Sequence, residues 1–276
     1  MNAPEDASEG DDPLERHRIR TGEAIASRDE GAIKSLYIEL GGDFWRLAGG
    51  PTDYAVPVLS APETLSTVTH ALAGTDGLIL DAGCGPNPAV AIALAREPSR
   101  CIVALDLGWG MVRTAKSVAE GEGLGLLAVA GDVERLPFRR GVFDVVVCDD
   151  TIEHLPNDEA GVSELARVLR PAGRALLATP NRHSAPVLWR RLQDLVRGAR
   201  KSAREYFVAS SHLREYTWPE FERLVGPFFV IDRRQPVGWH SGWKKRVITR
   251  LLWLPGLFRV SQMIVLQCHP RSNGST

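Results

Sequence analysis

The sequence has no run of 18 or more apolar residues, so it predicts no helix that spans a membrane. Its acidic N-terminus lacks the basic start and the apolar stretch of a signal peptide. The four cysteines are widely spaced with no Cys-x-x-Cys pair, which argues against structural zinc and favours reduced, buried thiols. Hydrophobic residues make up 44% of the 276 residues, enough for a sizeable core. These features predict a soluble, cytoplasmic protein.

The formal net charge of −1 hides an asymmetry along the chain. The first 181 residues hold 16 basic and 28 acidic residues, whereas residues 182–259 hold 16 basic and 6 acidic ones. A basic C-terminal third is typical of proteins with an anionic partner. Arginine-rich helices that only face water would give the same composition, so both interpretations stay open.

A short apolar segment at residues 78–80 leads into Asp81 and a turn with Gly83 and Gly85. Glycine allows a sharp turn and lets a ligand approach the backbone closely. In open α/β sheets, ligands bind at the carboxyl ends of the strands. The dinucleotide fingerprint requires a third glycine at position 88, where this chain has Pro88, so the turn does not favour a nicotinamide cofactor.

Three more apolar segments, at residues 101–105, 126–130 and 143–148, are each followed by an acidic residue. These acids are Asp106, Asp132 and Asp149. An acid after the second strand can accept hydrogen bonds from ribose hydroxyls. The series therefore predicts a cofactor site at one edge of a parallel sheet.

In these segments the chain resembles the class I S-adenosylmethionine-dependent methyltransferases, in the small-molecule branch that includes ubiquinone-pathway O-methyltransferases. The matching segments are LDAGCG at 80–85, LDL at 105–107, GDVERLPF at 131–138, FDVVVC at 143–148 and LARVLRPAG at 165–173. They cover roughly residues 77–181. The resemblance is specific for fold and cofactor and says little about the acceptor.

The resemblance implies a Rossmann-like, seven-stranded, mostly parallel sheet in the order 3-2-1-4-5-7-6, with the last strand antiparallel and helices on both faces. Periodicity and capping signals predict the elements along the chain. The expected helices are 62–73, 89–96, 109–121, 158–169 and one after Thr217, and the later strands are 175–179, 228–233 and 262–268.

The expected domain organisation has three parts. Residues 1–13 form a disordered acidic tail, 14–73 an N-terminal helical lid, and 74–276 the methyltransferase domain. Within this domain, residues 182–226 and 239–259 are expected as helical insertions on the substrate side.

The resemblance also assigns the cofactor residues. Asp81, Gly83 and Gly85 are expected around the methionine portion, with Asp81 near its amino group, and Asp106 at the ribose hydroxyls with Leu107 beside the adenine. Met111 is expected either beside the cofactor or in the helix core. Asp132 is expected to accept from the adenine amino group and the Val133 amide to donate to the ring, while Cys148 and Asp149 border the methionine group.

The segment after the fourth strand, residues 150–156, carries the candidate catalytic groups. His154 is either a general base for a hydroxyl acceptor or a structural residue, and His212 lies where related families place a second histidine. Asp150, Glu153 and His154 resemble a partial metal motif that would hold a divalent cation such as Mg²⁺.

The sequence thus predicts methyl transfer to a hydroxyl of a small molecule: a sugar, phenol, polyketide or lipid headgroup, with an anionic acceptor left open. The alternatives are an amine acceptor and an RNA 2′-hydroxyl, although no nucleic-acid-binding module is recognisable. The intact acids argue against a non-catalytic subunit. Residues 244–254 combine basic and apolar residues, which suits either a helix on an anionic membrane surface or one over the substrate cavity. The sequence leaves the oligomeric state undetermined.

Overall fold

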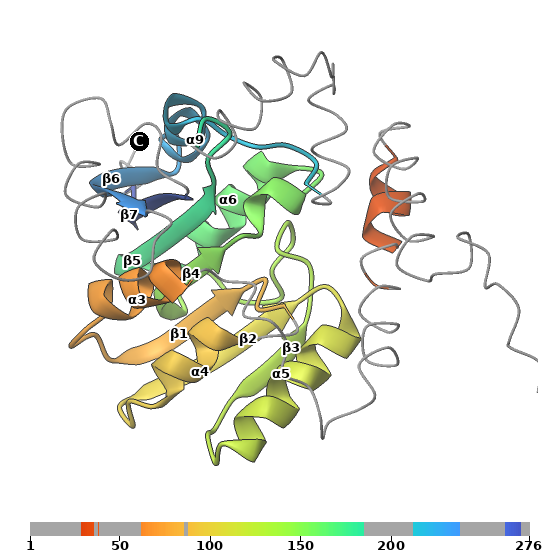
Figure 1. Ribbon diagram of the computed structural model, residues 1–276, viewed down its shortest axis with the longest axis vertical. Helices are drawn as coiled ribbons and strands as arrows, with labels where there is room; N and C mark the ends of the chain where they lie inside the picture. The colour runs from red at the N-terminus through yellow and green to blue at the C-terminus, as the bar shows by residue number, and fades with distance from the viewer. Residues whose placement is uncertain are drawn as a thin grey trace, which may run out of the picture.

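The computed structural model describes residues 29–35, 38, 62–85, 88–184, 212–237 and 263–271, which build one seven-stranded sheet with helices around it (Figure 1). The strand order is β3-β2-β1-β4-β5-β7-β6, and β7 is antiparallel to both β5 and β6 while the other pairs are parallel. This confirms the predicted fold class. The strands are β1 Gly77–Ala82, β2 Arg100–Asp106, β3 Leu127–Ala130, β4 Phe143–Asp149, β5 Leu169–Pro180, β6 Phe229–Val237 and β7 Met263–Pro270.

Alternating side chains of the strands give each face of the sheet its own hydrophobic core. In β1, Ile79 belongs to one core and Leu80 to the other, and both are fully buried. Helices α3 (Pro62–Ala71), α4 (Ala89–Ala95) and α5 (Trp109–Gly121) cover the Ile79 face. Helices α6 (Asp158–Val168) and α9 (Trp218–Val225) cover the Leu80 face. Cover on both faces explains why the central strands are almost continuously apolar.

The predicted elements match the structure except at two strands. Helix α5 has the predicted bounds, whereas β5 begins at Leu169 rather than at 175. Its pairing shifts register, from Phe143 opposite Leu169 to Val145 opposite Arg174, so the residues between Leu169 and Arg174 form an irregularity. Pro171 and Gly173 in this stretch are typical of a turn, so the sequence pattern predicted only the part of β5 that follows them. Strand β6 extends beyond 233 because its pairing with β7 continues to Val237.

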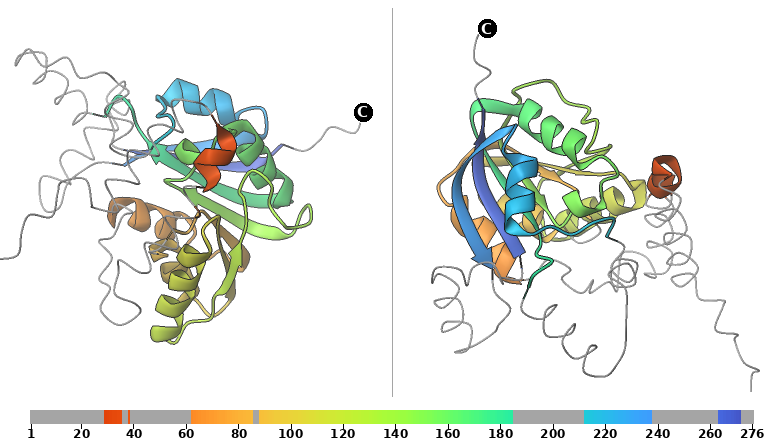
Figure 2. Two further views of the ribbon diagram at one scale, coloured as in Figure 1. Left: turned by 90° about the vertical axis from the view of Figure 1, so that its right-hand side faces the viewer. Right: turned by 90° about the horizontal axis from the view of Figure 1, so that it is seen from above.

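Several predicted segments lie outside the described residues. These are the tail at 1–13, the insertion at 239–259 with the basic segment 244–254, and most of the lid and of the insertion at 182–226. The described part of the predicted lid includes a helix at residues 30–35, which lies apart from α3 (Figure 1 and Figure 2). Among the helices that the structure describes, none is long and apolar enough to cross a membrane. The domain bounds stay predictions.

A capping interaction fixes the start of α9 and the segment before it. The Thr217 N–H donates to the Glu220 carboxylate (2.8 Å), and Arg182 Nη2 lies 2.7 and 2.8 Å from its two oxygens. Burial raises the pKa of Glu220, but hydrogen bonds from Thr217 and Arg182 outweigh it and lower that pKa to about 2. A β-bridge joins Asn181 to Tyr216 just beside this cap. Residues 212–217 are therefore held against the loop that follows β5.

Phe221→Ala is expected to lower the free energy of unfolding by about 3–5 kcal/mol, because the Phe221 side chain is fully buried in the Leu80 core. Leu127→Ala on the edge strand is the matched control, since Leu127 is 56% exposed and its loss should change stability by less than about 0.5 kcal/mol. Urea unfolding of both variants measures the difference. Equal losses would contradict the core assignment of α9.

Candidate active site

The strand order brings four acidic residues to one edge of the sheet. Strands β3, β2, β1 and β4 are parallel neighbours, so their carboxyl ends lie side by side. Asp132 follows β3, Asp106 ends β2, Asp81 lies near the end of β1, and Asp149 ends β4. The predicted series of acids therefore lies along one continuous edge.

The turn after β1 depends on Gly83. Its φ angle is +82°, in the left-handed region that favours glycine. A Cβ atom at this position would lie 2.2 Å from Thr151 Oγ1, so the turn also packs directly against the segment that follows β4. The N–H groups of Gly83 and Cys84 both donate to the Leu105 carbonyl, at 2.7 and 3.0 Å, which ties the turn to β2.

The Asp106 carboxylate is oriented by backbone donors. Gly85 N–H donates to one oxygen and Gly108 N–H to the other, both at 3.0 Å. Burial raises the pKa of Asp106, and these backbone donors counter part of the effect. A carboxylate offers about four lone-pair sites, so Asp106 keeps acceptor capacity for a ligand. Apart from Gly85 itself and its chain neighbours, no atom of the described residues lies within 4 Å of the position that a Cβ on Gly85 would occupy.

Asp81 is a buried acid whose side chain is 3% exposed. Burial, with a smaller effect from the Asp106 charge, raises the pKa of Asp81 to about 7. An ionised carboxylate in such surroundings is stabilised by a cation placed beside it.

The remaining predicted cofactor residues fall into two groups. Met111, Val133 and Cys148 are buried and belong to the packed interior, while Leu107 is partly exposed. Burial raises the pKa of the Cys148 thiol well above its usual value, which fits a core side chain rather than a nucleophile. Cys84 and Cys268 are buried as well, but Cys101 is exposed, so the prediction of buried thiols is wrong for Cys101, which lies near the start of β2.

The segment after β4 carries a buried carboxyl with an unusual environment. Asp150 has a φ angle of +53°, and Glu153 lies in the short helix η1 (Ile152–His154). Glu153 is fully buried, its Oε2 accepts from Thr179 Oγ1 (3.1 Å), and its Oε1 has no hydrogen-bond donor among the described residues. Burial and the Asp150 charge raise the pKa of Glu153 well above its usual value. A donor or a cation at Oε1 would relieve this cost.

The structure brings His154 and His212 together although 57 residues separate them. Their ring centroids lie 4.8 Å apart in an edge-to-face arrangement. Leu213 N–H donates to the Glu153 carbonyl (3.0 Å), which holds residues 212–217, the His212 segment, beside η1. His212 Nδ1 lies 3.4 Å from Glu215 Oε1. Ligand atoms of Glu153, His154 and His212 all lie within 4.8 Å of one another. The predicted metal set of Asp150, Glu153 and His154 thus gains His212, and Asp150 is not among these three ligand atoms.

Sequence reasoning did not identify five polar residues of this region. They are Lys34, Glu134, Thr151, Thr179 and Glu215. Lys34 Nζ lies 2.7 Å from Asp132 Oδ2 and 2.6 Å from Glu134 Oε2, across about 100 residues of chain. No local pattern announces a contact over that separation. Glu134 lies inside a quoted motif and Thr179 ends a predicted strand, but only the folded structure gives their side chains these partners.

Part of the chain is similar to known proteins. Residues 80–177 match a family of methyltransferase domains. A malonyl-[acyl-carrier protein] O-methyltransferase of Geobacter sulfurreducens is 35% identical over 131 residues, which are 47% of this chain and 48% of that protein. A ubiquinone biosynthesis O-methyltransferase of Coxiella burnetii is 25% identical over 153 residues, 55% of this chain and 63% of that protein. The similarity thus spans less than two thirds of either relative.

Solved structures share the fold at low sequence identity. Magnesium protoporphyrin IX methyltransferase from Synechocystis PCC 6803, solved with bound SAH, superposes with a TM-score of 0.58 at 21% identity over 88% of this chain and 100% of that chain. The [4+2]-cyclase SpnF superposes with a TM-score of 0.60 at 15% identity over 88% and 97%. At such identity the likeness concerns the fold alone. Residues 80–177 thus match a methyltransferase domain, and the sheet that contains them has a fold shared with a solved methyltransferase structure.

Proposed function

We propose that this protein transfers the methyl group of S-adenosylmethionine to a hydroxyl of a small-molecule acceptor. The observation that carries the proposal is the row of carboxylates at the ends of β1 to β4, with the backbone of Gly85 open beside Asp106. The two relatives described above are both named O-methyltransferases, which supports a hydroxyl over an amine.

On this proposal, three of the four carboxylates each contact a different part of the cofactor. Asp106 accepts from the ribose hydroxyls with the lone pairs that its backbone donors leave free. Asp81 lies beside the cationic amino group, which compensates for its burial. Asp132 accepts from the adenine amino group. The turn at Gly83 and Gly85 borders the methionine portion.

The acceptor side is formed by the two histidines. When bound, S-adenosylmethionine supplies an activated methyl group on its sulfonium, which the acceptor oxygen takes by in-line displacement. His212 removes the hydroxyl proton, and Glu215, 3.4 Å from its Nδ1, orients the ring. His154, in contact with the His212 ring, borders the acceptor.

We further propose that Glu153, His154 and His212 hold a divalent cation. The Glu153 Oε1 atom is buried without a hydrogen-bond partner among the described residues, and ligand atoms of Glu153, His154 and His212 lie within 4.8 Å of one another, so the residues fit such an ion. Two imidazoles and a carboxylate suit Mn²⁺ or Zn²⁺ better than the Mg²⁺ predicted from the sequence, since Mg²⁺ prefers oxygen ligands. When bound, such an ion would lower the pKa of an acceptor hydroxyl. His212 could then serve either as ligand or as base, and the two roles predict different effects of chelation.

An RNA acceptor receives less support from three of the five arginines that the structure describes in the basic third. Arg182, Arg214 and Arg234 each pair with a carboxylate, of Glu220, Asp158 and Glu222 respectively. These side chains are committed to internal ion pairs rather than presented to a phosphate backbone. A small-molecule acceptor is therefore the proposal we favour.

A cofactor-consumption assay over sugars, phenols, polyketides, lipid headgroups, amines and an RNA oligonucleotide tests the function. We expect turnover with a hydroxyl acceptor, and on that acceptor His212→Ala should lower kcat by about 100-fold or more with little change in the Kd of SAH. His70→Ala on the exposed end of α3 is the matched control and should leave both unchanged. Binding of SAH without methyl transfer to any acceptor would overturn the proposal.

Cofactor affinity should depend on pH through Asp81. Because the pKa of Asp81 in the free protein is about 7, the acid is mostly protonated at pH 6 and loses its attraction for the cofactor amino group. The Kd of SAH, measured by titration calorimetry, should be about tenfold weaker at pH 6 than at pH 8. Asp81→Asn should bind weakly at both pH values. A wild-type Kd that does not change with pH would contradict the role of Asp81.

Chelation separates the two roles of His212. If it is a ligand, a chelator should abolish turnover, Mn²⁺ should restore it, and calorimetry should detect Mn²⁺ binding that Glu153→Gln weakens at least tenfold. Glu159→Gln, on the exposed first turn of α6, is the control. Unchanged turnover in chelator and no Mn²⁺ binding would refute the metal proposal and leave His212 as base.

A further inference from the structure

The helix at residues 30–35 is held to the candidate cofactor site by one lysine. Lys34 Nζ bridges Asp132 Oδ2 (2.7 Å) and Glu134 Oε2 (2.6 Å), and the Glu134 side chain is only 7% exposed. Asp132 Oδ1 accepts from the Glu134 N–H (2.9 Å), so the lysine and this N–H together fix the orientation of the Asp132 carboxylate. Burial lowers the pKa of Lys34, but hydrogen bonds to both acids outweigh it and raise that pKa, which keeps the side chain charged.

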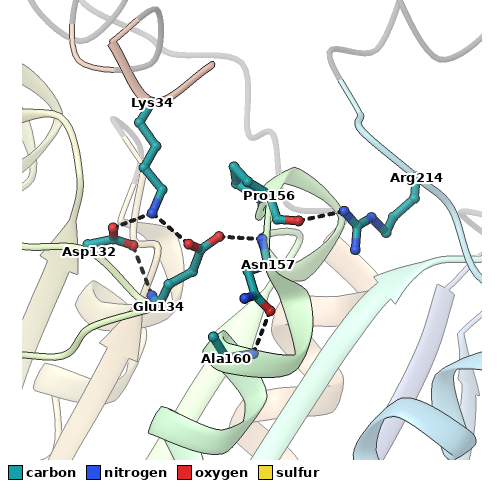
Figure 3. Close-up of polar contacts among 7 residues, drawn as sticks. All are labelled: Lys34, Asp132, Glu134, Pro156, Asn157, Ala160 and Arg214. Atoms are coloured by element: carbon teal, nitrogen blue, oxygen red, sulfur yellow. Dashed lines mark hydrogen bonds and ion pairs between the residues drawn. The ribbon is translucent and has the colours of Figure 1, made fainter. Parts of the chain in front are cut away.

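Glu134 connects this bridge to the start of α6. Its second oxygen, Oε1, accepts from the Asn157 N–H (2.7 Å), and Asn157 caps α6 by accepting from the Ala160 N–H (3.0 Å) (Figure 3). The chain of contacts thus runs from Lys34 through Glu134 to the first turn of α6.

The His212 segment meets the same turn from the other side. Arg214 donates to the Pro156 carbonyl (2.8 Å) and pairs with Asp158 (2.6 Å), as Figure 3 shows for Pro156. Leu213 also packs against Ile33 of the helix at residues 30–35, and Ile33 is only 5% exposed. Residues 30–35 and 212–214 therefore contact each other and share the start of α6 as support.

We infer that Lys34 is a positioning residue that couples binding of the adenosyl cofactor at Asp132 to the placement of the His212 segment. The inference rests on the proposed function, because Asp132 is the proposed adenine partner. With Lys34 in place, Asp132 is oriented for the adenine amino group and residues 30–35 lie over this end of the site. Without it, Asp132 and Glu134 are two neighbouring anions that repel each other, and Ile33 loses its support against Leu213.

The test compares Lys34→Met with the matched control Lys116→Met. Lys116 forms an exposed ion pair with Glu120 on α5, with side chains 58% and 65% exposed. Calorimetry should show SAH binding about tenfold weaker to Lys34→Met and unchanged for Lys116→Met. Lys34→Arg should restore the Kd to within about threefold, and Glu134→Gln, which keeps an acceptor for Asn157, should weaken it in the same direction as Lys34→Met.

Hydrogen exchange distinguishes coupling from a purely structural role of Lys34, because only coupling makes the effect of SAH on residues 212–217 depend on Lys34. In the wild type, SAH should slow amide exchange in both 29–35 and 212–217, and in Lys34→Met the SAH-dependent slowing at 212–217 should be lost. An unchanged or tighter SAH Kd in Lys34→Met, or slowing at 212–217 equal to that of the wild type, would overturn the inference. Failure of the wild type to bind SAH would instead refute the proposed function, so the two failures are distinguishable.

Discussion

The close approach of the turn after β1 to the segment after β4 is the constraint on which the site depends. Gly83 lies so near Thr151 that no side chain fits between them, and its φ angle requires glycine as well. The Thr151 hydroxyl donates to the carbonyls of Gly83 (3.3 Å) and Asp149 (3.0 Å), so the two segments are bonded as well as packed. This contact sets where Gly85 meets Asp106 and where η1 begins. Both the proposed cofactor half and the proposed acceptor half of the site are therefore built outward from it.

Buried carboxyl groups give the site its chemical character. Ionising an acid away from water is costly unless a cation or a donor faces it. Asp106 accepts hydrogen bonds from the N–H groups of Gly85 and Gly108, and Asp132 accepts from Lys34 and from the Glu134 N–H. Asp81 and one oxygen of Glu153 are less well compensated, and burial raises the pKa of both groups. An added positive charge would be stabilised beside either acid, and we therefore propose the cofactor amino group at Asp81 and a divalent cation at Glu153.

The start of α6 joins the periphery of the molecule to this site. Asn157, Asp158 and the Pro156 carbonyl receive contacts from Glu134 on one side and Arg214 on the other. Ion pairs of this kind are individually modest when exposed, but here they share partly buried partners and backbone groups. A change at one end can thus reach the other through a short series of direct contacts, without any rearrangement of the sheet.

The sequence by itself determined the apolar strands and the acids at their ends, whereas the strand order came from the family resemblance. Each of these strands is an apolar run followed by an acid. Strands that are buried on both faces are typical of parallel sheets, in which the carboxyl ends of neighbouring strands lie at the same edge. Local pattern alone therefore placed Asp81, Asp106 and Asp149 at one edge. Local pattern failed where a strand is interrupted, as in β5 between Leu169 and Arg174. Only the tertiary structure decided the pairing of His154 with His212, the burial of Glu153 and the bridge from Lys34 to Asp132. Those contacts join segments far apart in the chain, and their geometry follows from how loops pack on the finished sheet, for which no residue spacing carries a signal.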